Sequence, residues 1–240
     1  MIKSLVPLCQ AGGFPSDAWD PTLSGDIPLA IEFVETNASE LTLPPPPPDD
    51  SEETYSEIDY LKRIASKRSS TDIVLIAKEN HKPQRRFYNL LDITKADHPR
   101  TFELIERITS EAYLPILYFK HKFSRTRPYQ LDNSLNTVIE GPPHASYPSG
   151  HATQAYLLAL VLSKFLHEDD PRIEKLMTLG TEMGLRREIA GVHYPSDTQA
   201  GISLAKQLNT WLMEKPDFIE AFHAAKAELA SSDTLHSTAH

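Results

Sequence analysis

Residues 151–167 read His-Ala-Thr-Gln-Ala-Tyr-Leu-Leu-Ala-Leu-Val-Leu-Ser-Lys-Phe-Leu-His, and they contain the longest apolar stretch of the chain. That stretch runs from Ala155 to Leu162, where Ser163 and Lys164 interrupt it. It is far shorter than the roughly 18–20 apolar residues that span a bilayer, and its length suits a helix inside a protein core. The stretch therefore predicts a buried helix around which a helical protein is built.

The flanking segments repeat a helical spacing. Apolar residues recur at i, i+3 and i+4 in two places, at Ile58, Leu61, Ile64 and Ala65 and at Phe102, Ile105, Ile108 and Ala112. The second set belongs to a helix predicted from about His98 to His121, which Pro115 is expected to kink. Further helices are predicted over 151–167, 171–189, 196–213 and 216–230. Ile73–Ala77 could form a strand, but one strand makes no sheet, so the sequence predicts an all-α helical bundle.

Residues 1–54 lack this periodicity and predict an irregular, proline-rich segment. The run Pro44–Pro48 favours the extended polyproline II form, and we expect a stiff strap laid over the domain rather than a ligand for a partner groove. Acidic residues from Asp49 to Glu53 suit the first turn of a following helix. The predicted organisation is an N-terminal segment (1–54), a helical catalytic domain (55–230) and a polar tail (231–240).

Bulk composition limits the partners. The 240 residues carry a formal net charge of −9, which disfavours nucleic acid and anionic membranes as partners, so an anion site must be a local cluster of cations. Cys9 is the only cysteine, which excludes an intrachain disulfide. The apolar stretch of Met1–Cys9 is too short for a secretion signal. We expect a soluble protein, cytoplasmic as given or periplasmic if a leader has been removed, and a homo-oligomer stays open.

Three clusters of polar residues interrupt the helical pattern. The first, Lys120–Pro128, is rich in cations, and Lys120 and Arg127 could share a helix face or converge from helix and loop. Arginine forks onto phosphate oxygens and lysine serves as a point charge, but such a cluster by itself is more often a solvated helix end. We expect Lys122 and Arg125 to be that solvated face.

The second cluster, Ser146–His151, immediately precedes the apolar helix. Unpaired N–H groups at a helix start favour a bound anion, to which Ser149 could add a hydroxyl and Gly150 close backbone approach. An ordinary N-cap serine followed by a turn glycine explains the same residues equally well.

The third cluster, Arg186–Asp197, places His193 and Asp197 four residues apart near the start of a helix. A carboxylate there could accept a hydrogen bond from imidazole Nδ1 and leave Nε2 as a nucleophile, with Arg187 as a further cation. A surface contact is the common alternative for such a pair.

In this order, Lys-x6-Arg-Pro, Pro-Ser-Gly-His and Arg-x5-His-x3-Asp resemble the motifs of the type 2 phosphatidic acid phosphatase (PAP2) superfamily over Lys120–Asp197. That superfamily includes the bacterial class A acid phosphatases, which the proline-rich start also resembles, and the vanadium-dependent haloperoxidases. The resemblance implies the helical bundle of these proteins and a metal-independent phosphatase that forms a phosphohistidine. One departure is Arg186, which stands where members commonly carry a small residue.

The resemblance also implies roles for the site residues. Phosphate oxygens would be bound by Lys120, Arg127, Arg187, Ser149 and the Gly150 amide. His193 would attack phosphorus, held by Asp197, while His151 would protonate the departing alkoxide and then activate water. Fixed charges would supply most of the barrier reduction and His151 roughly 10²–10⁴-fold.

Other interpretations stay open at this point. His144, His151 and His193 are not spaced as a metal-ligand set, so we expect no metal and no cofactor, with a phosphate ester or phosphate as the small-molecule partner. A vanadium haloperoxidase would use the same motifs with bound vanadate, and a soluble lipid-phosphate or diphosphate phosphatase and a non-enzymatic phosphate-binding or scaffold protein are further alternatives. We expect His121 and His144 to be bystanders, and Tyr147 and Tyr194 to wall the pocket. The natural substrate stays open, because its contacts would come from the loop between Pro128 and Pro148.

Overall fold

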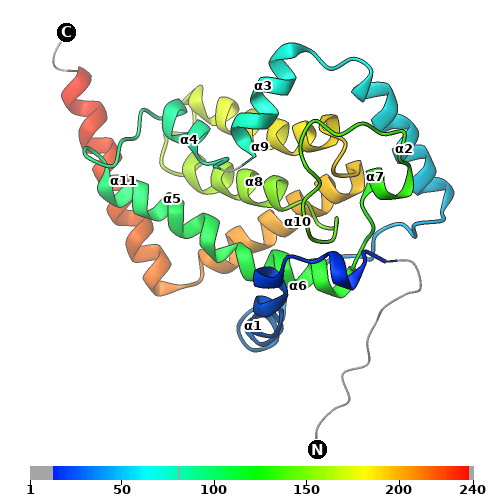
Figure 1. Ribbon diagram of the computed structural model, residues 1–240. Coiled ribbons are helices and arrows are strands. Elements are labelled where there is room, and N and C mark those ends of the chain that lie inside the picture. The colour runs from blue at the N-terminus through cyan, green and yellow to red at the C-terminus, as the bar shows by residue number, and fades with distance from the viewer. Residues whose placement is uncertain (1–12, 81, 238–240) are drawn as a thin grey trace, which may run out of the picture.

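The computed structural model describes residues 13–80 and 82–237, with side chains up to residue 231, and every regular element within them is helical. This confirms the predicted all-α class (Figure 1). Met1–Cys9, interpreted above as no signal, lies outside the described residues. The elements in chain order are a 3-10 helix η1 (Ser16–Ala18) and the helices α1 (Pro21–Asn37), α2 (Glu52–Ala65), α3 (Ser70–Glu79), α4 (Arg85–Leu90), α5 (Pro99–Glu111), α6 (Tyr113–Phe123), α7 (Pro128–Leu131), α8 (Gly150–Ser163), α9 (Arg172–Ile189), α10 (Pro195–Leu212) and α11 (Pro216–Ser237).

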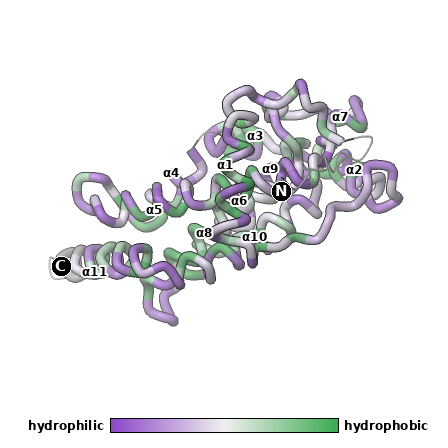
Figure 2. Tube along the Cα trace, turned by 90° about the horizontal axis from the view of Figure 1, so that it is seen from below, coloured by the Kyte–Doolittle hydropathy of each residue, from purple (hydrophilic) through white to green (hydrophobic). Residues whose placement is uncertain are grey.

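Helix α8 is the predicted core helix: eight of its 14 residues are buried and none is exposed. It packs against α9 and α10 most extensively and also touches α5 and α6. Figure 2 shows hydrophobic residues along these central helices and hydrophilic ones along peripheral α2. None of the helices among the described residues has the length and apolar character needed to cross a membrane.

Glycines let the helices approach closely where α8 begins. A Cβ on Gly201 of α10 would lie 2.7 Å from the Ser149 carbonyl oxygen, and one on Gly184 of α9 would lie 3.0 Å from the Ala152 Cβ. Neither position has room for a larger side chain. The starts of α8 and α10 and the end of α9 therefore converge at one place, which is where the second and third sequence clusters lie.

The N-terminal segment contains a helix that the sequence analysis missed. Residues 21–37 form α1, whose cap is the Asp20 side chain, which accepts hydrogen bonds from the backbone N–H groups of Thr22 (2.8 Å) and Leu23 (3.3 Å). Pro21 occupies the first turn, where its missing N–H costs nothing. The prediction of an irregular 1–54 segment was wrong here, because Gly25 and Pro28 inside the helix hid its pattern.

Three more element predictions need correction. Residues 73–77, considered as a strand, belong to helix α3, which Ser69 and Asp72 begin with a reciprocal capping box. The helix predicted over 98–121 is two helices that break at Ala112, with Pro115 tolerated in the first turn of α6. Helix α11 continues to Ser237, so the segment predicted as a tail is mostly helical.

Residues 39–48 carry no helix and lie against the domain as an extended strap. Leu41 and Leu43 are buried in the main core. The strap is fixed at one end by Thr42, whose backbone pairs with the Gln207 side chain of α10 (2.9 and 2.8 Å), and further along by the Tyr147 hydroxyl, which donates to the Pro44 carbonyl (2.7 Å).

Candidate active site

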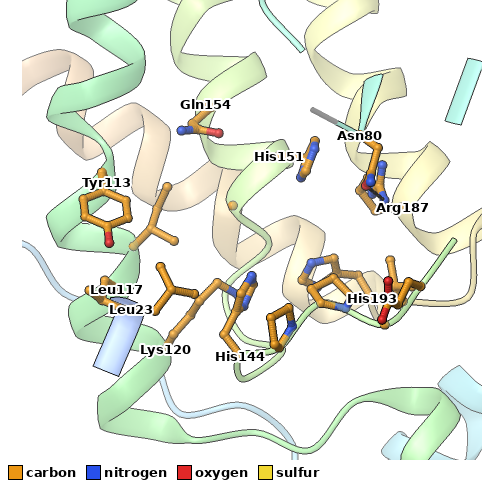
Figure 3. Close-up of a pocket in the computed structure, with 17 residues that line it drawn as sticks. Leu23, Asn80, Tyr113, Leu117, Lys120, His144, His151, Gln154, Arg187 and His193 are labelled. Carbon is orange, nitrogen blue, oxygen red and sulfur yellow. Dashed lines mark hydrogen bonds between the residues drawn. The ribbon is translucent and has the colours of Figure 1, made fainter. Parts of the chain in front are cut away.

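The convergence of α8, α9 and α10 borders a cavity of about 480 Å³. Its walls come from helices α1, α6, α8 and α9, from Asn80 just after α3, and from the loops that precede α8 and α10. Figure 3 shows the labelled side chains around it, with His193 and Arg187 on one side and Leu23, Leu117 and Tyr113 on the other. A pocket of this size with convergent polar groups is a site where a small molecule can bind.

His193 lies at the polar side of the cavity and is almost fully buried. Its Nδ1 is 3.0 Å from Asp197 Oδ2, and its Nε2 is 3.1 Å from an Arg127 guanidinium nitrogen. A guanidinium can only donate, so Nε2 carries the lone pair and Nδ1 carries the hydrogen that is donated to Asp197. This is the tautomer that a nucleophilic Nε2 requires.

Asp197 is held by several donors besides His193. Its carboxylate accepts from the Ser146 hydroxyl (2.5 Å), from the Tyr194 N–H (3.0 Å) and from Arg125 (2.8 Å). Burial alone would raise the pKa of Asp197, but the Arg125 charge and the hydrogen bond with His193 hold this pKa well below its usual range. Asp197 is therefore ionised, and it can stabilise positive charge on His193.

Arg125 corrects the expectation of a solvated face at the end of α6. Its side chain is 1% exposed and also binds Glu57 (3.0 Å), while its guanidinium lies 3.8 Å above the centre of the Tyr194 ring. Lys122 does face solvent. The sequence analysis missed the role of Arg125 because Glu57, its second carboxylate partner, lies 68 residues away in the chain.

Lys120 and Arg127 brace the loop before α8. The Lys120 ammonium donates to three carbonyl oxygens, those of Ala145 (2.8 Å), Ser146 (2.9 Å) and Pro148 (2.7 Å). Arg127 donates to the carbonyls of His144 (3.0 Å) and Val192 (2.7 Å) as well as to His193. Both side chains are buried next to His193, and the carbonyl oxygens around them, which only accept, require the hydrogens of the protonated forms.

Arg187 differs from the other two cations because part of its guanidinium has no partner. One terminal nitrogen donates to the Asn80 side-chain oxygen (3.1 Å). The other, Nη1, is buried without a hydrogen-bond partner among the described residues. Arg187 lines the cavity, so an anion bound there would satisfy this donor.

The helix start at Ser149–His151 contributes unequally. Ser149 is fully buried: its hydroxyl accepts from the Ala152 N–H (3.4 Å) and its own N–H donates to the Asp197 carbonyl (3.0 Å). Gly150 and His151 line the cavity. His151 Nε2 lies 3.2 Å from the Glu79 carbonyl oxygen, which can only accept, so Nε2 carries the hydrogen and Nδ1 the lone pair.

A buried ion cluster fixes the end of α3 beside His151. The Glu79 carboxylate is 1% exposed and binds Arg186 (2.7 Å) and Arg86 (2.7 Å). Arg186 also binds Glu182 at 2.9 Å. Arg186, which departs from the usual motif, therefore contacts the carboxylate of Glu79. The backbone carbonyl of the same residue faces His151.

The site holds several cations close together, and their pKa values show it. Burial is the main cause in each group: it lowers the pKa of Arg127 and Arg187 to about 10 and that of His151 to about 3. Repulsion from neighbouring cations adds to this effect for Lys120, Arg187 and His151. A dianion in the cavity would relieve this repulsion, because opposite charges favour the ionised forms.

Several residues lie elsewhere than expected. His144, considered a bystander, lines the cavity, and its Nδ1 is 3.0 Å from Arg127. His121 is exposed. Tyr147 and Tyr194, expected to wall the pocket, instead bind the strap and Arg125 respectively. Among residues 13–80 and 82–231, no three His, Cys, Asp or Glu side chains gather as metal ligands.

The fold and the site define a class of protein, all-α and with a histidine held among buried cations that can bind an oxyanion. Residues 104–216 match the PAP2 superfamily, the family that the sequence motifs resemble. The matched range includes all eight predicted site residues. Helices α1 to α4 lie before it.

Two curated relatives are both non-specific acid phosphatases. The chain is 32% identical to a non-specific acid phosphatase of Salmonella typhimurium over 148 residues, which are 60% of this chain and 58% of the relative. It is 32% identical to that of Providencia stuartii over 143 residues, 58% of this chain and 56% of the relative. The chain thus spans somewhat more than half the length of these relatives.

Solved structures share the fold. A bacterial vanadium-dependent iodoperoxidase superposes with a TM-score of 0.59 at 17% identity, over 75% of this chain and 53% of that one. A transmembrane PAP2-type phosphatidylglycerolphosphate phosphatase from Bacillus subtilis superposes with a TM-score of 0.51 at 18% identity, over 79% of this chain and 91% of that one. One helical framework therefore occurs in proteins of different chemistry and location.

Proposed function

We propose that this protein is a metal-independent phosphatase that hydrolyses phosphate monoesters through a phosphohistidine on His193. The observation that carries the proposal is the tautomer of His193, whose Nε2 lone pair lies among Lys120, Arg127 and Arg187 while Nδ1 donates to ionised Asp197. A nucleophile among fixed cations suits attack on a phosphate group. The two relatives called non-specific acid phosphatases support the same chemistry.

The two histidines have complementary roles in this mechanism. His193 Nε2 attacks phosphorus, the N–P bond forms as the bond to the leaving oxygen breaks, and Asp197 stabilises the imidazolium. His151 Nδ1 delivers a proton to the departing alkoxide. A water molecule then gives a proton back to Nδ1 as it attacks phosphorus, and the N–P bond breaks to release phosphate.

A bound phosphate would also prepare His151. Burial and the Arg187 charge lower the pKa of His151 to about 3, so Nδ1 would be unprotonated at neutral pH unless a bound anion opposed them. A dianion beside it opposes both causes and raises the pKa toward the working range of a general acid. Fixed cations at the phosphate oxygens take the place of a metal, and their charge would also repel a divalent cation.

The direct test is hydrolysis of p-nitrophenyl phosphate by the whole chain. We expect activity that survives EDTA and competitive inhibition by vanadate, a tetrahedral oxyanion that fits the same cations. His193→Ala is expected to lose turnover to background, whereas His121→Ala, which changes an exposed histidine, keeps it. Activity lost to EDTA and restored by a divalent metal would contradict the mechanism, and so would substantial turnover by the His193→Ala variant.

The same cavity would accept vanadate as a cofactor, which makes haloperoxidase chemistry the second candidate. The structural similarity to an iodoperoxidase concerns the fold alone. One preparation assayed twice separates the two functions, for phosphomonoester hydrolysis without vanadate and for peroxide-dependent halide oxidation with it. Halide oxidation well above background would reverse the order of the two proposals.

A further inference from the structure

The cavity has two chemically different halves. The polar half holds His193, His151, Arg187 and Lys120. The other half is lined by apolar side chains from α1, α6 and the loop before α8, namely Leu23, Ile116, Leu117, Pro142 and Pro143, with Tyr113 beside them. Figure 3 shows Leu23, Leu117 and Tyr113 gathered opposite Arg187 and Asn80.

Helix α1 is held in place to form this wall. It packs along α6, and Asp26 of α1 accepts a hydrogen bond from the Tyr113 hydroxyl of α6 (2.6 Å). The contact fixes Leu23, one turn earlier on α1, against the cavity. Leu23 lies outside residues 104–216, so the apolar wall depends on a helix beyond the part of the chain that matches the superfamily.

Size and charge indicate what this half can hold. A phosphate group occupies only a small part of about 480 Å³, so the remainder must accommodate the group esterified to it. Lys120 and Arg187, the cations that line the cavity, both lie in the polar half. A second phosphate in the apolar half would therefore lie away from them. Glu140 adds an exposed carboxylate to the lining, which would repel an anionic leaving group.

We propose that the apolar half of the cavity is a leaving-group subsite, and that it selects phosphate monoesters of uncharged aryl or compact alkyl alcohols over esters with polar or anionic leaving groups. This inference rests on the proposed phosphatase function and names its substrate class. Leu23 and Tyr113 are the specificity-determining residues, and Glu140 excludes a second charge.

The first test needs only the unaltered protein. Benzylphosphonate and methylphosphonate carry the same non-hydrolysable anion, and they differ by an aromatic ring. We expect benzylphosphonate to inhibit about tenfold more tightly, because the ring transfers from water to the apolar half. Equal inhibition constants would overturn the subsite while leaving the anion site and the phosphatase function intact.

The second test uses matched variants of one helix. Leu23→Asn should lower the ratio of kcat/KM for 2-naphthyl phosphate to that for glycerol 2-phosphate about tenfold, with the inhibition constant of inorganic phosphate unchanged. Leu29→Asn is the control, because Leu29 lies on the same helix and is 53% exposed. Glu140→Gln should raise relative activity toward pyrophosphate.

The outcomes separate the two proposals. An unchanged ratio in an active Leu23→Asn variant overturns the subsite alone. Equal kcat/KM values for 2-naphthyl phosphate and glycerol 2-phosphate in the unaltered protein would also overturn the subsite. Failure to hydrolyse any of the esters overturns the phosphatase function and the leaving-group subsite with it.

Discussion

The two histidines of the site are held in different ways. His193 belongs to a dense buried network in which Asp197 accepts from four groups and Arg125 joins Asp197 to Glu57 of α2. The His151 ring is hydrogen-bonded to a backbone carbonyl at the end of α3. The first arrangement supplies a full negative charge, and the second supplies only a dipole.

This difference matches what each proposed role demands. A nucleophile becomes an imidazolium when it bonds to phosphorus, so a fixed carboxylate beside it lowers the barrier. A general acid and base must change its protonation state twice per turnover, so a strong ionic partner that locked one state would slow it. The carbonyl of Glu79 orients His151 without fixing its charge.

The largest expected effect comes from removing the charge on the nucleophile side. Asp197→Asn leaves no carboxylate to stabilise the imidazolium and can impose the wrong tautomer, so we expect kcat to fall by about 10³–10⁴-fold. Steady-state hydrolysis of p-nitrophenyl phosphate measures it. Asp217→Asn, which alters a carboxylate that is 72% exposed and bound to Arg107, is the control. A loss below tenfold would mean that Asp197 only holds the fold.

The next largest effect concerns stability rather than rate. Arg125→Ala leaves Asp197 buried without its ionic partner, and breaking such a pair costs about 3–5 kcal/mol. Urea unfolding of the variant measures the loss, and Lys122→Ala, at an exposed cation three residues earlier in the chain, should change stability by less than about 0.5 kcal/mol. Similar small losses in both variants would show that the network around Asp197 does not depend on Arg125.

The two sides also differ in how far the sequence predicted them. His193 and Asp197 are four residues apart and stand in a recognisable motif, so their pairing could be predicted from spacing. Arg125 and Glu57, which support Asp197, and Glu79, which orients His151, reach the site only through the packing of segments that are distant in the chain. Short-range patterns carry no information about such contacts.

The fold shows the same division. Helices α8 to α10 have long apolar or regularly spaced runs, and their approximate extents could be predicted. Helix α1 could not, because Gly25 and Pro28 break its pattern, while its Asp20 cap and packing on α6 stabilise it. For α3 a signal existed, because Ser69 and Asp72 form a capping box, but the apolar run Ile73–Ala77 obscured it.

A weaker effect should come from the acid side. Glu79→Gln would disrupt its ion pairs with Arg186 and Arg86 and loosen the carbonyl that orients His151, so we expect kcat to fall about tenfold for alkyl phosphates. p-Nitrophenyl phosphate should be affected less, since its leaving group needs little protonation. Glu182→Gln is the control, because Glu182 binds the same arginine from the surface.

If Glu79 had only a structural role, the loss of kcat in Glu79→Gln would not depend on the leaving group. If Glu79→Gln slows alkyl and p-nitrophenyl esters equally, the residue supports folding and does not position His151. Asp197→Asn should slow both esters alike, because it acts on the nucleophile and not on the leaving group. Comparing the two variants on the two esters therefore separates the two sides of the site.

A further effect is a dependence of stability on pH from the nucleophile side. Glu188 is buried near Asp197 and Glu57, and burial together with these carboxylates raises its pKa from 4.5 to about 7. The folded protein thus holds a proton that the unfolded chain releases near pH 4.5. The Glu188 contribution is fully present below pH 4.5 and is lost as the pH rises through about 7, a change of about 3 kcal/mol.

Urea unfolding at intervals between pH 4.5 and 7 tests this directly, with Glu188→Gln as the matched variant that cannot titrate. The variant should lose less stability than the unaltered protein over this interval, because the amide mimics the protonated carboxyl at every pH. Since other groups titrate equally in both proteins, the difference between the two curves isolates Glu188. Parallel curves would mean that Glu188 is ionised in the folded protein. Arg125 would then face three ionised carboxylates, those of Asp197, Glu57 and Glu188. The difference in charge between the His193 side and the His151 side would be larger.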